Sequence, residues 1–190
     1  MKKLGIIICG LVLMMGCERN IYRFTEGSVY GTVYHVSYQS EVDYTVEIRQ
    51  EMERVNQSLS MFNKESVIAR WNRGESERVD SLFVTMYEKA REVYEATGGG
   101  FDITVAPLVN AWGFGFKNEK LPSDGKIDSL LQYVGMDKVQ LEGVRLVKLV
   151  EGVQIDASSI AKGLGVDLVA EFFDREGVQN YMIEIGGEIR

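Results

Sequence analysis

The segment that most constrains this chain is residues 152–167, where an apolar run meets an acidic residue, two serines, a lysine and several glycines. Its first four residues, GVQI, predict a strand, and a helix is expected to begin near Ala161. A strand that turns into a helix points free N–H groups and the positive end of the helix dipole at one spot, which suits a phosphate. Lys162 adds a cation and Asp156 a carboxylate, as a site for a phosphate and a cation requires. The spacing matches neither a Walker A loop nor a G-x-G-x-x-G fingerprint.

The rest of the sequence predicts one α+β domain. Strands are predicted over residues 22–38, 138–155 and 181–185, and helices over residues 45–59, 66–72, 81–97, 123–134 and 161–176. Because these elements alternate irregularly, we expect a mixed, largely antiparallel sheet with packed helices rather than a regular βαβ array. In the helix over residues 123–134, Ile127, Leu130, Leu131 and Val134 are expected to face inward. The net charge of −7 argues against nucleic acid as a partner.

The pattern at the start of the chain indicates an export signal rather than a part of the fold. Two lysines precede an apolar run over residues 4–15, which is too short to span a bilayer as a stable helix. The run ends in a glycine followed by Cys17, which resembles the cleavage site of a bacterial lipoprotein. We therefore expect residues 1–16 to be a signal peptide, Cys17 to carry lipid, and residues 17–190 to lie membrane-anchored on the periplasmic side of the bacterial cell envelope. A plain secretory signal or an uncleaved anchor is the alternative.

The cysteine and histidine content of the chain excludes several kinds of catalytic and metal sites. With Cys9 in the signal and Cys17 lipidated, the domain has no disulfide and no thiol for a nucleophile or a zinc site. His35 is the only histidine, which excludes a metal site built from several histidines. It also excludes a serine–histidine–aspartate triad supported by further histidines.

Three further clusters stand out, and each has an ordinary structural alternative. Gly31–Thr32 lies between two predicted strands and could be a bulged edge of the sheet. Residues 60–72, which begin with Ser-Met-Phe, could be a helix–helix connection with its caps. Residues 98–115 contain five glycines, one proline and several aromatic side chains. This composition suits a slot for a planar ring, but it also suits a buried turn.

The opening segment has an alternative as well, in which Asp156 caps the last helix and Lys162 faces solvent. A helix cap alone does not require so specific an order of elements and residues, which is strand, aspartate, two serines, alanine, lysine and glycine. Together the four clusters indicate a pocket for a planar ring tethered to phosphates, with a divalent cation.

The motifs in these clusters resemble the FAD:protein FMN transferase (ApbE) family. They are GT-x-Y at residues 31–34, FD-x-TV-x-PLVN-x-WGFG at residues 101–115, D-x-x-S-x-AKG-x-x-VD at residues 156–167 and IGGEIR at residues 185–190. They fall in the family's order and the match covers roughly residues 25–190. Four collinear motifs are far more specific than any single one.

The resemblance implies a Mg²⁺-dependent enzyme that binds FAD, cleaves its diphosphate and moves FMN onto a threonine hydroxyl of a target protein, releasing AMP. Targets in the family are typically subunits of membrane redox complexes, and many members are periplasmic lipoproteins, in agreement with Cys17. Some members also hydrolyse FAD to FMN and AMP. A flavin-holding lipoprotein without transfer and an FAD pyrophosphatase are therefore the alternative functions.

The resemblance also assigns roles residue by residue. The expected FAD contacts are Tyr30, Ser60, Met61, Phe62, Phe101, Asp102, Ile103, Asp156 and Lys162. Asp156 and Lys162 are the expected catalytic residues, and Ser159 matches a Mg²⁺ position, through its backbone carbonyl. Magnesium bridging the diphosphate would neutralise charge that builds on the leaving AMP.

Length is a serious departure from the family pattern. Family members usually run well over a hundred residues further, and that part carries a histidine-containing strand and an Asp/Thr motif that complete the metal site. We therefore expect either the N-terminal part of a transferase or a truncated relative, with the C-terminal part of the fold absent. If the 190 residues are the whole protein, we expect weak transfer of FMN or none.

Overall fold

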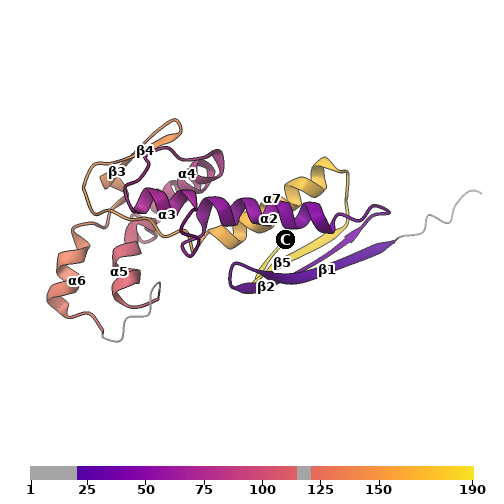
Figure 1. Cartoon of the computed structure of the whole chain (residues 1–190), viewed down its shortest axis with the longest axis horizontal. Coiled ribbons are helices and arrows are strands. Elements are labelled where there is room, and N and C mark those ends of the chain that lie inside the picture. Colours follow the sequence, from indigo (N-terminus) through magenta and orange to yellow (C-terminus); the bar gives the residue numbers. More distant parts are fainter. Residues whose placement is uncertain (1–20, 115–120) are drawn as a thin grey trace, which may run out of the picture.

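The computed structural model describes residues 21–114 and 121–190 and confirms the α+β architecture (Figure 1). One antiparallel sheet has the strand order β1-β2-β5-β6. Its strands are β1 (Tyr22–Val29), β2 (Thr32–Gln39), β5 (Tyr181–Ile185) and β6 (Glu188–Ile189). β2 and β5 therefore join segments that lie about 150 residues apart in sequence, as the pairing of His35 with Glu184 shows.

Alternation along β2 explains why this sheet has one buried face. Tyr34, Val36 and Tyr38 are buried, whereas the residues between them point to the opposite face. Two helices, α2 (Thr45–Leu59) and α7 (Ala161–Arg175), cover the buried face (Figure 1). The opposite face leaves several large apolar side chains exposed, namely Phe24, Val33, Met182 and Ile189.

A second core forms around the far end of α2. It is built by α3 (Val67–Asn72), α4 (Ser81–Ala96) and a hairpin of β3 (Val139–Glu142) and β4 (Arg145–Lys148). The remaining elements are η1 (Ile103–Val105), α5 (Ala106–Ala111), α6 (Asp124–Leu131) and η2 (Met136–Lys138). Trp71 ties α3 to the hairpin, because its indole N–H donates to the carbonyl of Leu146 at 2.7 Å. Since α2 and α7 contribute side chains to both cores, they join the two halves of the molecule.

The strand predicted over residues 152–155 is wrong. Residues 153–157 form neither a helix nor a strand, and they pair with no strand of the described residues. The side chain of Asn72 takes the place of a neighbouring strand: its amide donates to the carbonyl of Ile155 at 2.8 Å and its oxygen accepts from the Ile155 N–H at 2.8 Å. We call this pair of bonds the Asn72 clamp. An apolar pattern predicts extended backbone equally well whether the partner is a strand or a side chain.

The helix over residues 123–134 is shorter and more exposed than expected. α6 ends at Leu131 and has no fully buried residue, and Leu131 is 47% exposed. Ile127, Leu130 and Val134 are half-buried. No helix in the described ranges has both the length and the apolar character needed to cross a bilayer.

Candidate functional site

Two tight turns meet at one end of the four-stranded sheet. Tyr30–Gly31 joins β1 to β2 and Gly186–Gly187 joins β5 to β6, and all four residues have positive φ, as two-residue type I′ hairpin turns require. The turns lie side by side, because Gly186 N–H donates to the carbonyl of Val33 at 3.0 Å. The first and last sequence motifs are therefore neighbours in space.

Gly186 is needed at its position for two reasons. Its φ is +56°, and a β-carbon there would lie 2.7 Å from Cγ2 of Thr32. Tyr30 adopts a φ of +52° without being glycine, which costs about 1–2 kcal/mol. A hydrogen bond of 2.6 Å from its hydroxyl to the carbonyl of Met52 on α2 offsets part of that cost. Burial, and to a lesser extent the charge of Glu53, raises the pKa of this hydroxyl.

α7 begins beside the two turns and brings Lys162 to them. The Lys162 ammonium donates to the carbonyl of Gly186 at 3.1 Å and lies 3.6 Å from Oε1 of Glu188. Its side chain is 35% exposed, so it is anchored but reachable from solvent. The ring of Tyr30 lies over Gly165, where a β-carbon would come within 3.1 Å of it. Gly165 thus lets the helix approach the hairpin turn.

A cavity of about 210 Å³ opens between these elements, where the two cores meet. It brings together five of the residues expected to contact FAD: Tyr30, Ser60, Met61, Phe62 and Lys162. Residues that the sequence reasoning did not select complete the wall, namely Val55, Asn56, Leu59, Ser158 and Ala161. Val55 and Leu59 belong to the apolar face of α2, and such a face does not distinguish a core position from a cavity wall.

The loop after α2 holds its shape through its own serines. The Ser60 hydroxyl accepts from the N–H groups of Phe62 and Asn63, at 3.3 and 3.1 Å. Ser66 donates to the carbonyl of Ser60 at 2.7 Å and accepts from Ala69 N–H at 3.1 Å as the N-cap of α3. The loop is therefore ordered while Phe62 at its tip is 71% exposed.

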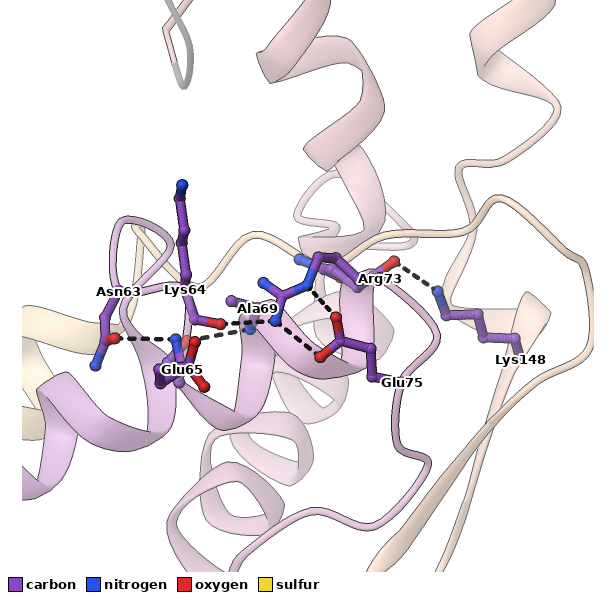
Figure 2. A network of polar contacts seen from close by, with 9 residues as sticks. Asn63, Lys64, Glu65, Ala69, Arg73, Glu75 and Lys148 are labelled. Carbon is purple, nitrogen blue, oxygen red and sulfur yellow. Dashed lines mark hydrogen bonds and ion pairs between the residues drawn. The ribbon is translucent and has the colours of Figure 1, made fainter.

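A second cavity of about 460 Å³ shares Met61 and Phe62 of this loop with the first. Figure 2 shows the polar network along its α3 side, in which Arg73 bonds to both carboxylate oxygens of Glu75 and to the carbonyl of Lys64. The Arg73 guanidinium keeps the pKa of Glu75 below its usual value. Lys64 extends away from this network toward open space (Figure 2).

Residues 101–103, the second expected FAD-contacting stretch, do not line the 210 Å³ cavity. Asp102 caps η1, because its carboxylate accepts from the N–H and the hydroxyl of Thr104 at 2.7 and 2.6 Å. Ile103 is fully buried and its carbonyl accepts from Asp156 N–H at 2.7 Å. Phe101 packs against the second core. In the described structure this stretch supports the turn that carries Asp156.

Asp156 shapes its own turn. Its carboxylate accepts from Ser158 N–H at 2.7 Å and is nearly buried. It is not the cap of the last helix, because α7 has Ile160 at its N-cap and no side-chain cap bond. Ser159 is exposed in the same turn, next to the cavity-lining Ser158. Within residues 21–114 and 121–190, no three histidine, cysteine or acidic side chains gather as a metal site.

The aromatic slot expected within residues 98–115 does not form part of the 210 Å³ cavity. Trp112 and Phe114 are 44% and 82% exposed. The last residue of that motif, Gly115, and the lipidation candidate Cys17 lie outside the described residues.

Comparisons with known proteins agree with this arrangement. The FAD:protein FMN transferases of Vibrio cholerae and Haemophilus influenzae are 33% and 36% identical to the whole chain, which covers 60% and 61% of their lengths. The flavin transferase ApbE from Vibrio cholerae superposes with a TM-score of 0.84 at 34% identity, over 90% of this chain and 59% of that one. The apo flavinyl transferase ApbE of Pseudomonas stutzeri gives 0.85 at 29% identity, over 93% of this chain and 62% of that one.

The chain thus spans about three-fifths of the length of the curated relatives that it matches. The family model for the ApbE family matches residues 30–190, which include both hairpin turns and the start of α7. The chain belongs to the ApbE family.

Proposed function

We propose that this chain forms the FAD-holding part of an FAD:protein FMN transferase. The observation that carries the proposal is the cavity in which Tyr30, the Ser60–Phe62 loop and Lys162 converge from three separate segments. Its walls are mostly apolar and its polar groups are few, which suits a planar ring with a charged tail. The relatives that cover the whole chain carry the same activity in their names.

FAD is larger than a cavity of 210 Å³, and the second cavity offers room for the remainder. The two cavities flank Phe62, so a dinucleotide could extend from one to the other along an exposed aromatic side chain. We propose that the ring of the flavin lies on the Tyr30 side, where the wall is apolar and Lys162 is near.

The reaction that we propose is phosphoryl-group transfer. A threonine hydroxyl of the target attacks the phosphorus of the FMN half, a P–O bond forms, and the bond from that phosphorus to the bridging oxygen breaks. AMP leaves with the bridging oxygen, and the threonine proton passes to solvent or to a carboxylate. The Lys162 ammonium, held by Gly186, would offset the negative charge that develops on the diphosphate.

We include Mg²⁺ in the proposal because this ion binds oxygen atoms, and the turn after Ile155 carries oxygen atoms of that kind. Ser159 is exposed there and offers hydroxyl and carbonyl oxygens, and Mg²⁺ commonly takes only one or two protein ligands beside phosphate and water. When bound, the ion would neutralise charge on the diphosphate. Among the described residues no set of three histidine, cysteine or acidic side chains gathers there, so the proposal relies on few protein ligands and on the oxygens of the diphosphate.

Binding and transfer are tested separately. FAD affinity is measured by quenching of flavin fluorescence for the wild type, Lys162→Ala and the matched control Lys89→Ala. The Lys89 ammonium pairs with Glu92 on the exposed face of α4. We expect tenfold or greater weakening for Lys162→Ala alone, as for loss of one charge-assisted contact. Unchanged binding in Lys162→Ala would refute the site.

Transfer is followed with a threonine-bearing target peptide and Mg²⁺, with AMP measured by chromatography and flavin by its mass on the peptide. Labelled peptide with stoichiometric AMP supports the transferase. AMP and free FMN without labelled peptide indicate an FAD pyrophosphatase, and retained FAD without AMP indicates a flavin-holding protein.

We also propose that the mature protein is a lipoprotein whose target belongs to a membrane redox complex. The support is the signal-like start of the chain and Cys17. Metabolic labelling with a fatty-acid analogue should mark the wild type and not Cys17→Ser, and equal labelling of both would refute lipidation at that residue.

A further inference from the structure

The only histidine of the chain is bonded to a carboxylate next to the Gly186–Gly187 turn. Nδ1 of His35 on β2 lies 2.7 Å from Oε2 of Glu184 on the adjoining strand β5. Nothing in the proposed chemistry uses this pair, which lies on the face of the sheet opposite to α2 and α7. The Glu184 side chain is only 18% exposed, so the bond is partly shielded from water.

The other oxygen of Glu184 holds the turn itself. Oε1 accepts from the N–H of Gly187 at 2.6 Å. The preceding residue, Gly186, gives its carbonyl to the Lys162 ammonium at 3.1 Å. A continuous chain of hydrogen bonds therefore runs from His35 through Glu184 and the turn to the cation that lines the candidate FAD cavity.

We propose that His35 and Glu184 are positioning residues that hold the Gly186–Gly187 turn, and through it Lys162, so that protonation of His35 strengthens the binding of a diphosphate in the cavity. The proposal rests on the proposed function for the identity of that diphosphate. The hydrogen-bond chain itself does not depend on it.

The charges around the pair determine the sign of the effect. Glu26 on β1 lies 4.0 Å from Nε2 of His35, so the imidazole faces carboxylates on both sides. On the far side of the turn, Lys162 faces Glu188 of β6. The hydrogen bond from His35, followed by that from Gly187, keeps the pKa of Glu184 below its usual value, so Glu184 stays an acceptor in neutral solution.

Because Glu184 is ionised, its hydrogen bond with His35 is charge-assisted in either state of the imidazole. Protonation of His35 adds the Coulombic attraction of a partly exposed ion pair. The turn is therefore held more firmly when the imidazole is charged. Histidine side chains in general change charge between about pH 5 and 8, which is the range over which the effect is measured. FAD keeps both charges of its diphosphate over this range. Affinity for FAD should thus fall by about two- to fivefold from pH 5.5 to 8, as for a partly exposed ion pair.

The test compares FAD affinity against pH in the wild type, His35→Gln, Glu184→Gln and Glu26→Gln. His35→Gln should bind with no pH slope. In Glu184→Gln the amide oxygen can still accept from Gly187, but its NH₂ faces a protonated imidazole, so the slope should vanish or reverse. Glu26→Gln removes the same charge beside the same histidine without touching the turn, and should keep the wild-type slope. Wild-type slopes in both His35→Gln and Glu184→Gln would overturn the inference.

A second readout does not require FAD. The amide-proton resonance of Gly187 should move with pH in the wild type and in Glu26→Gln, and stay fixed in His35→Gln. If FAD fails to bind any variant, the proposed function fails, and the Gly187 resonance still decides the inference. A Gly187 resonance that moves with pH equally in the wild type and in His35→Gln, or in neither, would overturn it.

Discussion

The Asn72 clamp makes a quantitative prediction about how the turn that carries Asp156 is held. Asn72→Ala removes the donor to the Ile155 carbonyl and the acceptor of the Ile155 N–H, each at 2.8 Å. Ile155 is fully buried, so both backbone groups lose their partners where no strand replaces them among the described residues.

The magnitude follows from the two bonds. Leaving a buried polar group without a partner costs about 1–3 kcal/mol. Because Asn72 is half-buried, water can enter part of the space left by its amide. We therefore expect the free energy of unfolding to fall by about 2–3 kcal/mol in total, which lowers Tm by about 5–10 °C in a chain of this length.

Urea denaturation followed by circular dichroism measures this loss, with Asn180→Ala as the matched control. Asn180 also bonds through its amide, to the side chain of Gln39, but Asn180 is itself exposed, so its loss should cost under about 0.5 kcal/mol. FAD affinity should fall in Asn72→Ala and not in Asn180→Ala, because the clamped segment leads into the turn of Asp156 and Ser158. Equal stability of the two variants would refute the reasoning.

Two further predictions concern the hairpin turns. Gly186→Ala should destabilise the protein by about 2–3 kcal/mol in thermal unfolding, since it adds a clash with Thr32 to the cost of a positive φ, whereas Gly187→Ala, with open space around it, should cost about 1 kcal/mol. Equal losses would show that the clash relaxes freely. Tyr30 has a raised pKa, so the unfolded chain releases its phenolic proton first and the folded state loses stability as pH rises above about 10. Tyr30→Phe should therefore show a smaller alkaline loss of stability than the wild type. Its neutral stability should be lower by about 1 kcal/mol, for the missing bond to Met52.

The sequence carries enough information for the elements and for most of the motifs, because both depend on local patterns. Alternation identifies β1 and β2, and apolar spacing identifies α2, α4 and α7. The collinear motifs lead to the same family as the comparisons. Their residue types also single out the Ser60–Phe62 loop and Lys162, which the fold brings to one cavity.

The parts that could not be predicted depend on contacts between distant segments. No local pattern shows that Asn72 bonds to backbone 83 residues later, and the apolar run before Asp156 was therefore read as a strand. A single sequence does not reveal the pairing of β2 with β5. This pairing brings Tyr30 close to Gly165 and Thr32 close to Gly186. For the same reason the sequence does not reveal the partner of His35, since Glu184 lies 149 residues away.

The pairing of β2 with β5 also sets the order in which the protein can be completed during synthesis. The hairpin of β1 and β2 emerges early, but β5, the inner neighbour of β2, follows about 150 residues later. Until then one edge of β2 has no partner, and helix α2 has no sheet of full width to cover. Contacts of such high sequence separation form slowly. The cavity beside Lys162 should therefore form on a ribosome-bound chain only after β5 has emerged, and a nascent chain arrested before Tyr181 should be open to proteases at the early hairpin.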